Sequence, residues 1–341
     1  MKAKFHLRKS KLIEQYETIK KECDIVSYSL KTNYEVGEIL EDMTDCWISV
    51  HFIRSLEKIK DKSRILFFAQ AWNVEDLDKI ISQGVRMVVI DNEGDLQTLL
   101  EYLRNKEIKI TLFLRMRMKE HTIHTGKHFV FGLNAKRVNQ IILEEKNNPN
   151  IEALGIHFHR KTQNIHEWSM QYELKDSLTE ETLNAIHWLN IGGGMPVKYK
   201  NSRAERLKYI FTEIQKLREW LKPYNIKLIT EPGRYLAAPA IKLNAQITAI
   251  YNNNIVLNCS VYNAAMDTFI AHVRLEVEGE CEKGHPYTIK GCTPDSMDIF
   301  RYRAFLDNPK VGDTLTFLNA GAYNFNSNFC NLEKIETIIE E

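Results

Sequence analysis

The sequence predicts an α/β protein: a (βα)8 barrel of the TIM type with a second, smaller C-terminal domain of antiparallel β structure. Two observations predict this fold. Short apolar segments alternate with longer amphipathic segments through the first two-thirds of the 341 residues, and β-rich segments replace them after about residue 240. We expect the barrel to span residues 8–238. Residues 239–341, together with 1–7, are expected to form a β-sandwich or β-barrel domain.

The predicted barrel strands are apolar on both faces, as parallel strands are when both sides of a sheet are covered. Amphipathic helical patterns lie between them, each with one apolar stripe that faces the sheet. Eight such units favour a closed barrel over an open sheet. Strands are expected at 25–30, 47–50, 65–69, 86–90, 108–114, 153–159, 188–191 and 226–230, and helices at 74–82, 93–104, 135–146 and 203–221.

The C-terminal third shows no long helical pattern. Its short β-rich segments are separated by polar turns, which is typical of an antiparallel β domain. We expect strands at 243–250, 255–261, 272–277, 287–290 and 313–318, and a first strand at 4–7 that returns to this domain.

Composition excludes several classes of protein. The 46 basic and 45 acidic side chains leave a net charge of +1, so the basic surface of a nucleic-acid-binding protein is not expected. No long apolar run predicts a membrane span, and the N-terminus lacks the apolar core of a secretory signal. The six cysteines are scattered without a CxxC pair, which predicts neither a disulfide framework nor a metal site and favours the cytoplasm.

In a (βα)8 barrel the chemistry lies at the carboxyl ends of the strands. The first predicted strand ends at Lys31. A partly buried lysine has a lowered pKa and is suited to form a Schiff base with an aldehyde. The alternative is a surface lysine that caps the barrel.

The sixth predicted strand ends in Gly-Ile-His157-Phe-His159, and strand alternation places both histidines on one face. They have no adjacent carboxylate or HExxH motif to suggest a metal site. Either an imidazole stacks on an aromatic ring of a cofactor, or both are hydrogen-bonded histidines of the barrel.

Glycines and charges follow the last two predicted strands. Gly192, Gly193 and Gly194 follow the seventh strand, where many barrels bind phosphate. Glu231 and Arg234 follow the eighth. A guanidinium suits a phosphate and a carboxylate suits a pyridinium nitrogen, although the two side chains could also form a structural salt bridge. Together with Lys31 these groups match pyridoxal 5′-phosphate (PLP).

These motifs run in order from Tyr28-Ser-Leu-Lys31-Thr-Asn to Asn319-Ala-Gly-Ala-Tyr323. At them, over nearly its whole length, the chain resembles the fold-type III PLP-dependent decarboxylases. This group contains ornithine, arginine, diaminopimelate and carboxynorspermidine decarboxylases. The resemblance implies a PLP-binding barrel, and a Glu231 carboxylate on the ring nitrogen favours decarboxylation over racemisation.

The resemblance also implies a role for each matching residue. Lys31 forms the Schiff base, and His159 stacks on the ring. Arg115 orders the site. The phosphate is bound by Thr162, the three glycines, Arg234 and Tyr323. The expected catalytic residues are Lys31, His159, Glu231, Cys292 and Asp295, and the expected substrate-binding residues are Asp267, Asp295 and Asp298.

The family is usually a homodimer with shared active sites, in which a segment matching 291–298 reaches the neighbouring barrel. Here Pro294 stands where the family has a cysteine that is a candidate proton donor, and Cys292 stands where proline would be. Either Cys292 swings into the site, or a water or His157 reprotonates the substrate carbon, or turnover is impaired. Arg160 and Lys161 replace a Val-Gly pair; they either bind an anion or, as we expect, lie in a solvated loop.

We therefore expect a decarboxylase of an amino acid with a distal amine, such as ornithine, lysine or arginine, in polyamine-type metabolism. One alternative is a carboxynorspermidine or carboxyspermidine decarboxylase, or a tailoring enzyme that acts on an aminocarboxypropyl group. The substrate would then be a carboxylated polyamine or a larger molecule. Another alternative is a non-catalytic binding protein similar to antizyme inhibitors.

Overall fold

A computed structural model of the chain describes residues 2–118, 131–202, 204 and 206–341. The chain forms two compact units. The barrel unit comprises Glu17–Met195 and Arg206–Pro232, and the second unit comprises Met1–Tyr16, Pro196–Glu205 and Gly233–Glu341. Within the described residues, no helix has the length and apolar character needed to cross a bilayer.

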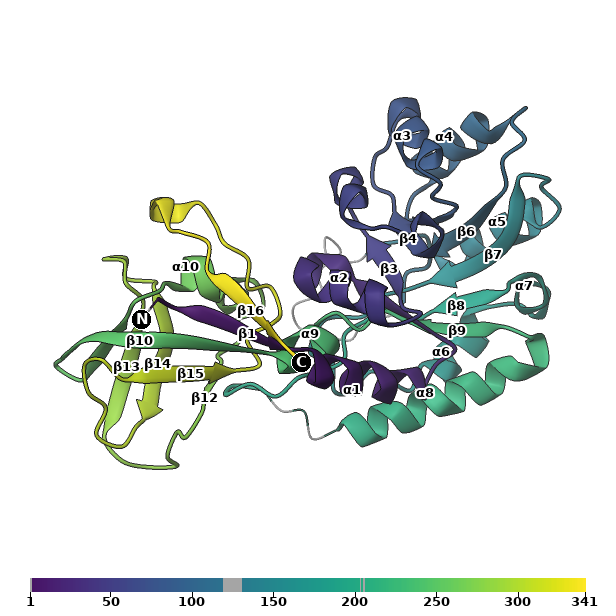
Figure 1. The fold of residues 1–341 in the computed structure, drawn as a ribbon. Helices are drawn as coiled ribbons and strands as arrows, with labels where there is room; N and C mark the ends of the chain where they lie inside the picture. Colours follow the sequence, from purple (N-terminus) through teal and green to yellow (C-terminus); the bar gives the residue numbers. More distant parts are fainter. Residues whose placement is uncertain (1, 119–130, 203, 205) are drawn as a thin grey trace. The chain divides into compact units, whose positions relative to one another are not determined.

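The barrel unit contains a closed barrel of eight parallel strands, which confirms the predicted fold class (Figure 1). Pairing of the first strand with the last closes it, with Ile25 opposite Ile229. Each predicted barrel strand overlaps an observed one. The observed strands are β2 (Ile25–Ser29), β3 (Trp47–Val50), β4 (Ile65–Phe68), β5 (Met87–Ile90), β6 (Ile110–Arg115), β7 (Ile151–His157), β8 (Trp188–Asn190) and β9 (Lys227–Thr230).

Helices follow most of these strands, and asparagine side chains begin several of them. Asn33, Asn73, Asn92 and Asn134 each accept a hydrogen bond from a backbone N–H of the first turn, as N-caps do. The predicted helix from 203 begins instead at Leu207; residues 203 and 205 lie outside the described residues. The helices are α1 (Lys9–Lys20), α2 (Tyr34–Met43), α3 (Val74–Ser82), α4 (Glu93–Leu103), α5 (Ala135–Glu145), α6 (Met170–Ser177), α7 (Glu180–Ala185) and α8 (Leu207–Leu221).

The second unit contains a mixed sheet. Most pairings are antiparallel, as predicted, but β1 pairs with β16 and β11 pairs with β13 in parallel. Two strands, β14 and β16, have no predicted counterpart. The strands are β1 (Lys4–Arg8), β10 (Ile241–Tyr251), β11 (Asn254–Leu257), β12 (Glu276–Val277), β13 (Pro286–Lys290), β14 (Ile299–Phe305), β15 (Thr314–Leu318) and β16 (Glu336–Glu340). Three short helices complete it: α9 (Arg234–Ala240), α10 (Val261–Ala264) and α11 (Asp267–Ile270).

A glycine on β7 allows close packing inside the barrel. A Cβ atom at Gly155 would lie 2.5 Å from Cδ1 of Phe113 and 3.0 Å from Cβ of Trp188. We predict that Gly155→Ala lowers the free energy of unfolding by about 1–3 kcal/mol, the usual cost of overpacking a core. Denaturant titration measures this change. The double variant Gly155→Ala/Phe113→Leu should be more stable than the sum of the single changes predicts, and strict additivity would contradict the steric explanation.

Candidate active site

Lys31 lies in a 3₁₀ turn, Leu30–Thr32, between β2 and α2. The turn is held at both ends. The Asn33 side chain caps α2, and the Tyr28 hydroxyl, which is fully buried, donates a 3.0 Å hydrogen bond to the Asn33 carbonyl. The carboxyl end of β2 thus presents the Lys31 amine from a defined backbone.

The Lys31 amine has a perturbed pKa. Its side chain reaches solvent, but protein surrounds much of its length, and this loss of water lowers the pKa of the ammonium. The Glu231 carboxylate opposes the shift, and the Arg115 guanidinium adds to it. A lowered pKa increases the fraction of neutral, nucleophilic amine, which is what Schiff-base formation requires.

Glu231 follows β9 and is 7% exposed. Its Oε1 accepts hydrogen bonds from Oγ of Ser49 at 2.8 Å and from Nδ2 of Asn190 at 3.0 Å. Ser27 lies behind Ser49, with 2.7 Å between the two hydroxyl oxygens. Sequence reasoning missed Ser49 and Asn190. The available signal was a polar residue near the carboxyl end of an otherwise apolar strand.

The other Glu231 oxygen, Oε2, lies 3.4 Å from Nε2 of His157, at the end of β7. Burial alone would raise the pKa of Glu231. The adjacent His157 and the hydrogen bonds from Asn190 and Ser49 outweigh burial and lower this pKa to about 2. Glu231 is therefore a buried anion at neutral pH.

His157 is almost completely buried, with 1% of its surface exposed. Its ring and the ring of Phe68 lie edge to face with 5.0 Å between their centroids, and Phe68 stacks on His51 at 4.7 Å. Burial lowers the pKa of His157, an effect that Glu231 opposes. The sequence did not point to His51 or Phe68 as neighbours of the site.

The backbone fixes the protonation of His159. The Gly193 N–H donates to Nδ1 of His159 at 3.1 Å. A backbone N–H can only donate, so Nδ1 carries no proton and a neutral ring carries its proton on Nε2. The two histidines predicted to share one face therefore have different partners: His159 has the glycine run, and His157 has Glu231.

The glycine run, residues 192–194, has a backbone conformation and close contacts that a side chain would disturb. Gly192 and Gly194 have φ values of +65° and +100°, which strongly favour glycine. A Cβ atom at Gly193 would lie 2.4 Å from the Glu231 carbonyl oxygen. The Gly192 N–H donates to Oδ1 of Asn190 at 2.9 Å, so the side chain that holds Glu231 also holds the start of this turn.

Other predicted barrel residues lie in or after β6 and β7. Arg115 is half-buried, and its guanidinium carbon lies 5.1 Å from the centre of the Phe131 ring. Thr162 is exposed in the loop after β7. Arg160 is not in a solvated loop: it is 7% exposed and pairs with Glu173 at 2.7 Å, so the expectation of solvation is wrong for this residue.

In the second unit, Arg234 and Asp267 form a buried, bidentate ion pair. The Arg234 guanidinium also donates to the Tyr199 hydroxyl at 3.1 Å, and its carbon lies 5.3 Å from the centre of the Tyr323 ring. In this structure the cation predicted to bind phosphate and the carboxylate predicted to bind substrate neutralise each other.

The segment around Cys292 is a folded turn. Asp298 is 1% exposed and accepts hydrogen bonds from the backbone N–H of Val261 and from the Thr293 hydroxyl, at 2.8 and 2.7 Å. Asp295 is half-buried and accepts from the Tyr262 hydroxyl at 3.3 Å. Cys292 is exposed. These contacts commit the Asp298 carboxylate to Thr293 in its own loop and to the start of α10.

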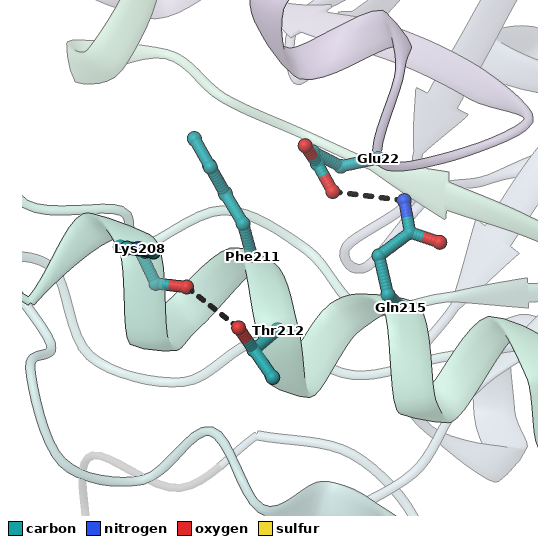
Figure 2. A pocket seen from close by; sticks show the side chains of 5 residues that line it. All are labelled: Glu22, Lys208, Phe211, Thr212 and Gln215. Atoms are coloured by element: carbon teal, nitrogen blue, oxygen red, sulfur yellow. Dashed lines mark hydrogen bonds between the residues drawn. The ribbon is translucent and has the colours of Figure 1, made fainter.

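A surface hollow of the barrel unit has a different character. Figure 2 shows that Phe211 and polar side chains line it, with Gln215 donating to Glu22 at 2.8 Å. Glu22 precedes β2, so this hollow lies where the strand begins, away from the strand ends that carry Lys31 and Glu231.

The barrel unit fits a phosphorylated pyridine aldehyde. It offers a lysine amine with a lowered pKa, a buried carboxylate anion for a ring N–H, and a tight glycine turn in which a Cβ atom would clash with neighbouring residues. Glycines without side chains let a phosphate approach the backbone of this turn closely.

Comparison with known protein families supports the same cofactor. The profile of the "pyridoxal-dependent decarboxylase, pyridoxal binding domain" family matches residues 12–238. The chain belongs to this family. The barrel is thus a pyridoxal-binding domain, and pyridoxal phosphate is its cofactor.

Individual relatives are distant in sequence. Mouse ornithine decarboxylase is 25% identical over 297 residues, a match that covers 76% of this chain and only 61% of that protein. Diaminopimelate decarboxylase of Campylobacter jejuni is 23% identical over 370 residues, covering 99% of this chain and 89% of the relative.

Solved structures share the fold. Diaminopimelate decarboxylase of Helicobacter pylori, complexed with L-lysine, superposes with a TM-score of 0.84 at 19% identity, covering all of this chain and 92% of that one. Lysine/ornithine decarboxylase of Vibrio vulnificus, complexed with putrescine, gives 0.79 at 20% identity, covering 99% and 94%.

The glycine turn gives a direct prediction. Gly193→Ala places a methyl group against the Glu231 carbonyl, so the turn must move. We expect the affinity for pyridoxal phosphate, measured by absorbance titration, to fall at least about tenfold, which corresponds to about 1.4 kcal/mol. Unchanged affinity in a folded variant would show that the turn is not the phosphate cradle.

Proposed function

We propose that this protein is a pyridoxal phosphate-dependent decarboxylase of an amino acid that carries a distal amine. The observation that carries the proposal is the ionised, buried Glu231 in the same barrel as the Lys31 amine of lowered pKa. Bound pyridoxal phosphate supplies an electron sink for the pair of electrons left when the carboxyl group departs.

The barrel residues have separate tasks in this proposal. Lys31 binds the aldehyde carbon through its amine, and the neutral ring of His159 lies against the cofactor face. Gly192, Gly193 and Gly194 form the turn that lets the phosphate approach the backbone, and Thr162, earlier in the chain, is a further phosphate ligand. Arg115 orders the site. Arg234 and Tyr323 are further proposed phosphate ligands, a role for which Arg234 would have to exchange its contact with Asp267.

Glu231 selects the reaction. A carboxylate anion stabilises a proton on the ring nitrogen, and a protonated ring withdraws electrons more strongly than a neutral one. Because this favours loss of carbon dioxide over reversible proton transfer at the same carbon, we propose decarboxylation and not racemisation.

The distal amine of the substrate requires an acidic partner. Asp295 keeps a partly exposed carboxylate, whereas Asp298 and Asp267 are committed to other contacts, so we propose Asp295 as the substrate residue. The Vibrio enzyme complexed with putrescine supports a diamine-type product in polyamine metabolism. A carboxynorspermidine, carboxyspermidine or tailoring decarboxylase is the alternative.

We further propose a cytoplasmic homodimer with shared active sites. The described cysteines are all free, as expected in a reducing compartment. The exposed Cys292 and the 58% exposed Met297 lie on the segment that would reach the neighbouring barrel.

The cofactor link through Lys31 has a simple test. Purified protein reconstituted with pyridoxal phosphate should be yellow, and borohydride should abolish the colour by fixing the cofactor covalently. Lys31→Ala should bind the cofactor only noncovalently and lose activity at least about 10³-fold, since the amine is the attachment point. Lys58→Ala, which removes an exposed lysine, should behave as the native protein.

Release of carbon dioxide identifies the activity. The panel is ornithine, lysine, arginine, diaminopimelate and carboxynorspermidine. We expect turnover of one or more substrates with a distal amine. Cofactor binding without turnover of any substrate would favour the non-catalytic binding protein over the enzyme.

Cys292 is tested separately as the proton donor. If it donates to the substrate carbon, Cys292→Ala should lower kcat about 10²-fold and increase the share of products protonated at a wrong position. Unchanged turnover and product partition would exclude this role. Cys330→Ala, another exposed cysteine, is the matched control.

A further inference from the structure

The carboxylate of Glu231 is used unequally by its neighbours. Oε1 accepts two hydrogen bonds, from Ser49 and Asn190. Two donors satisfy the two lone pairs of one carboxylate oxygen. The polar atom recorded beside Oε2 is Nε2 of His157, at 3.4 Å. Oε2, next to His157, can therefore accept a hydrogen bond from a ligand N–H.

The tautomer of His157 follows from the same contacts. Among the described residues, both ring nitrogens of His157 are buried and neither meets hydrogen-bond geometry, so the Glu231 anion, 3.4 Å from Nε2, determines where the proton lies. An anion favours a proton on the nitrogen that faces it. The neutral ring thus carries its proton on Nε2, the nitrogen 3.4 Å from Oε2.

Charged groups on neighbouring strands act on the pKa of His157 in opposite directions. The groups that act on it are Glu231 after β9, Arg115 on β6 and Asp91 after β5, and Lys31 and His51 complete the set near Glu231 and His159. Burial and Arg115 favour the neutral imidazole, whereas Glu231 and Asp91 favour the cation.

We propose that His157 is a positioning residue that donates its Nε2 proton to Oε2 of Glu231 and thereby keeps the proton of the bound cofactor on the ring nitrogen. This inference rests on the proposed function. A donor on Oε2 lowers the basicity of the carboxylate. The carboxylate then competes less well for the proton that it shares with the ring.

Variants of His157 test whether this residue acts as a hydrogen-bond donor through Nε2 or only fills space in the barrel. His157→Gln places an amide N–H near the position of Nε2, and His157→Asn places one near Nδ1, where no acceptor lies among the described residues. His157→Leu fills the space without a donor. His285→Gln, at an exposed histidine of the second unit, is the control.

The first measurement needs no cofactor. The Glu231 carboxyl is followed by ¹³C NMR in glutamate-labelled protein and assigned by its absence in Glu231→Gln. Loss of the donor destabilises the anion, so Glu231 takes up its proton at higher pH. In His157→Leu and His157→Asn the midpoint should rise by at least about one pH unit, and in His157→Gln it should stay near that of the native protein.

The second measurement uses pyridoxal phosphate labelled with ¹⁵N in its ring. The ring ¹⁵N resonance should have the shift of a protonated pyridine in the native protein, His157→Gln and the control. It should move toward the neutral-pyridine value in His157→Leu and His157→Asn. A native-like Glu231 midpoint in His157→Leu overturns the inference. Failure of native protein to bind the cofactor overturns the proposed function instead, while the ¹³C titration still decides the role of His157.

Discussion

The buried carboxylate of Glu231 is the interaction on which the rest of the site depends. An unpaired carboxylate in a barrel core would be protonated, because burial disfavours the charge. Three strands prevent this by placing Ser49, Asn190 and His157 around the two oxygens. The site thus requires the closed barrel. Strands β3, β7 and β8 and the end of β9 each contribute one of the four residues, namely Ser49, His157, Asn190 and Glu231.

Asn190 extends this constraint to the rest of the site. Its amide donates to Glu231 and accepts from Gly192, and Gly193 in turn donates to His159. One hydrogen-bonded chain therefore connects the proposed ring-nitrogen, phosphate and ring-face contacts. The backbone supports it, because the Glu231 N–H donates to the Gly192 carbonyl at 2.8 Å.

Much of the barrel could be predicted from sequence because parallel strands covered on both faces are apolar throughout, and eight such runs stand out. The strand β14 was missed because Arg301, 2% exposed and paired with Glu280, interrupts its apolar pattern. Lys31 and Glu231 stand at strand ends and were found by position. The partners Ser49 and Asn190 were missed because no local pattern shows which strands meet across a barrel.

Neutron diffraction from crystals of the pyridoxal phosphate-loaded protein, exchanged into D2O, tests the central claim most directly because it locates the exchangeable hydrogens. The account predicts no deuterium on either Glu231 oxygen, one on Nε2 of His157, and none on Nδ1 of His159. Deuterium on a Glu231 oxygen would show that burial wins over the three donors, and it would contradict the account.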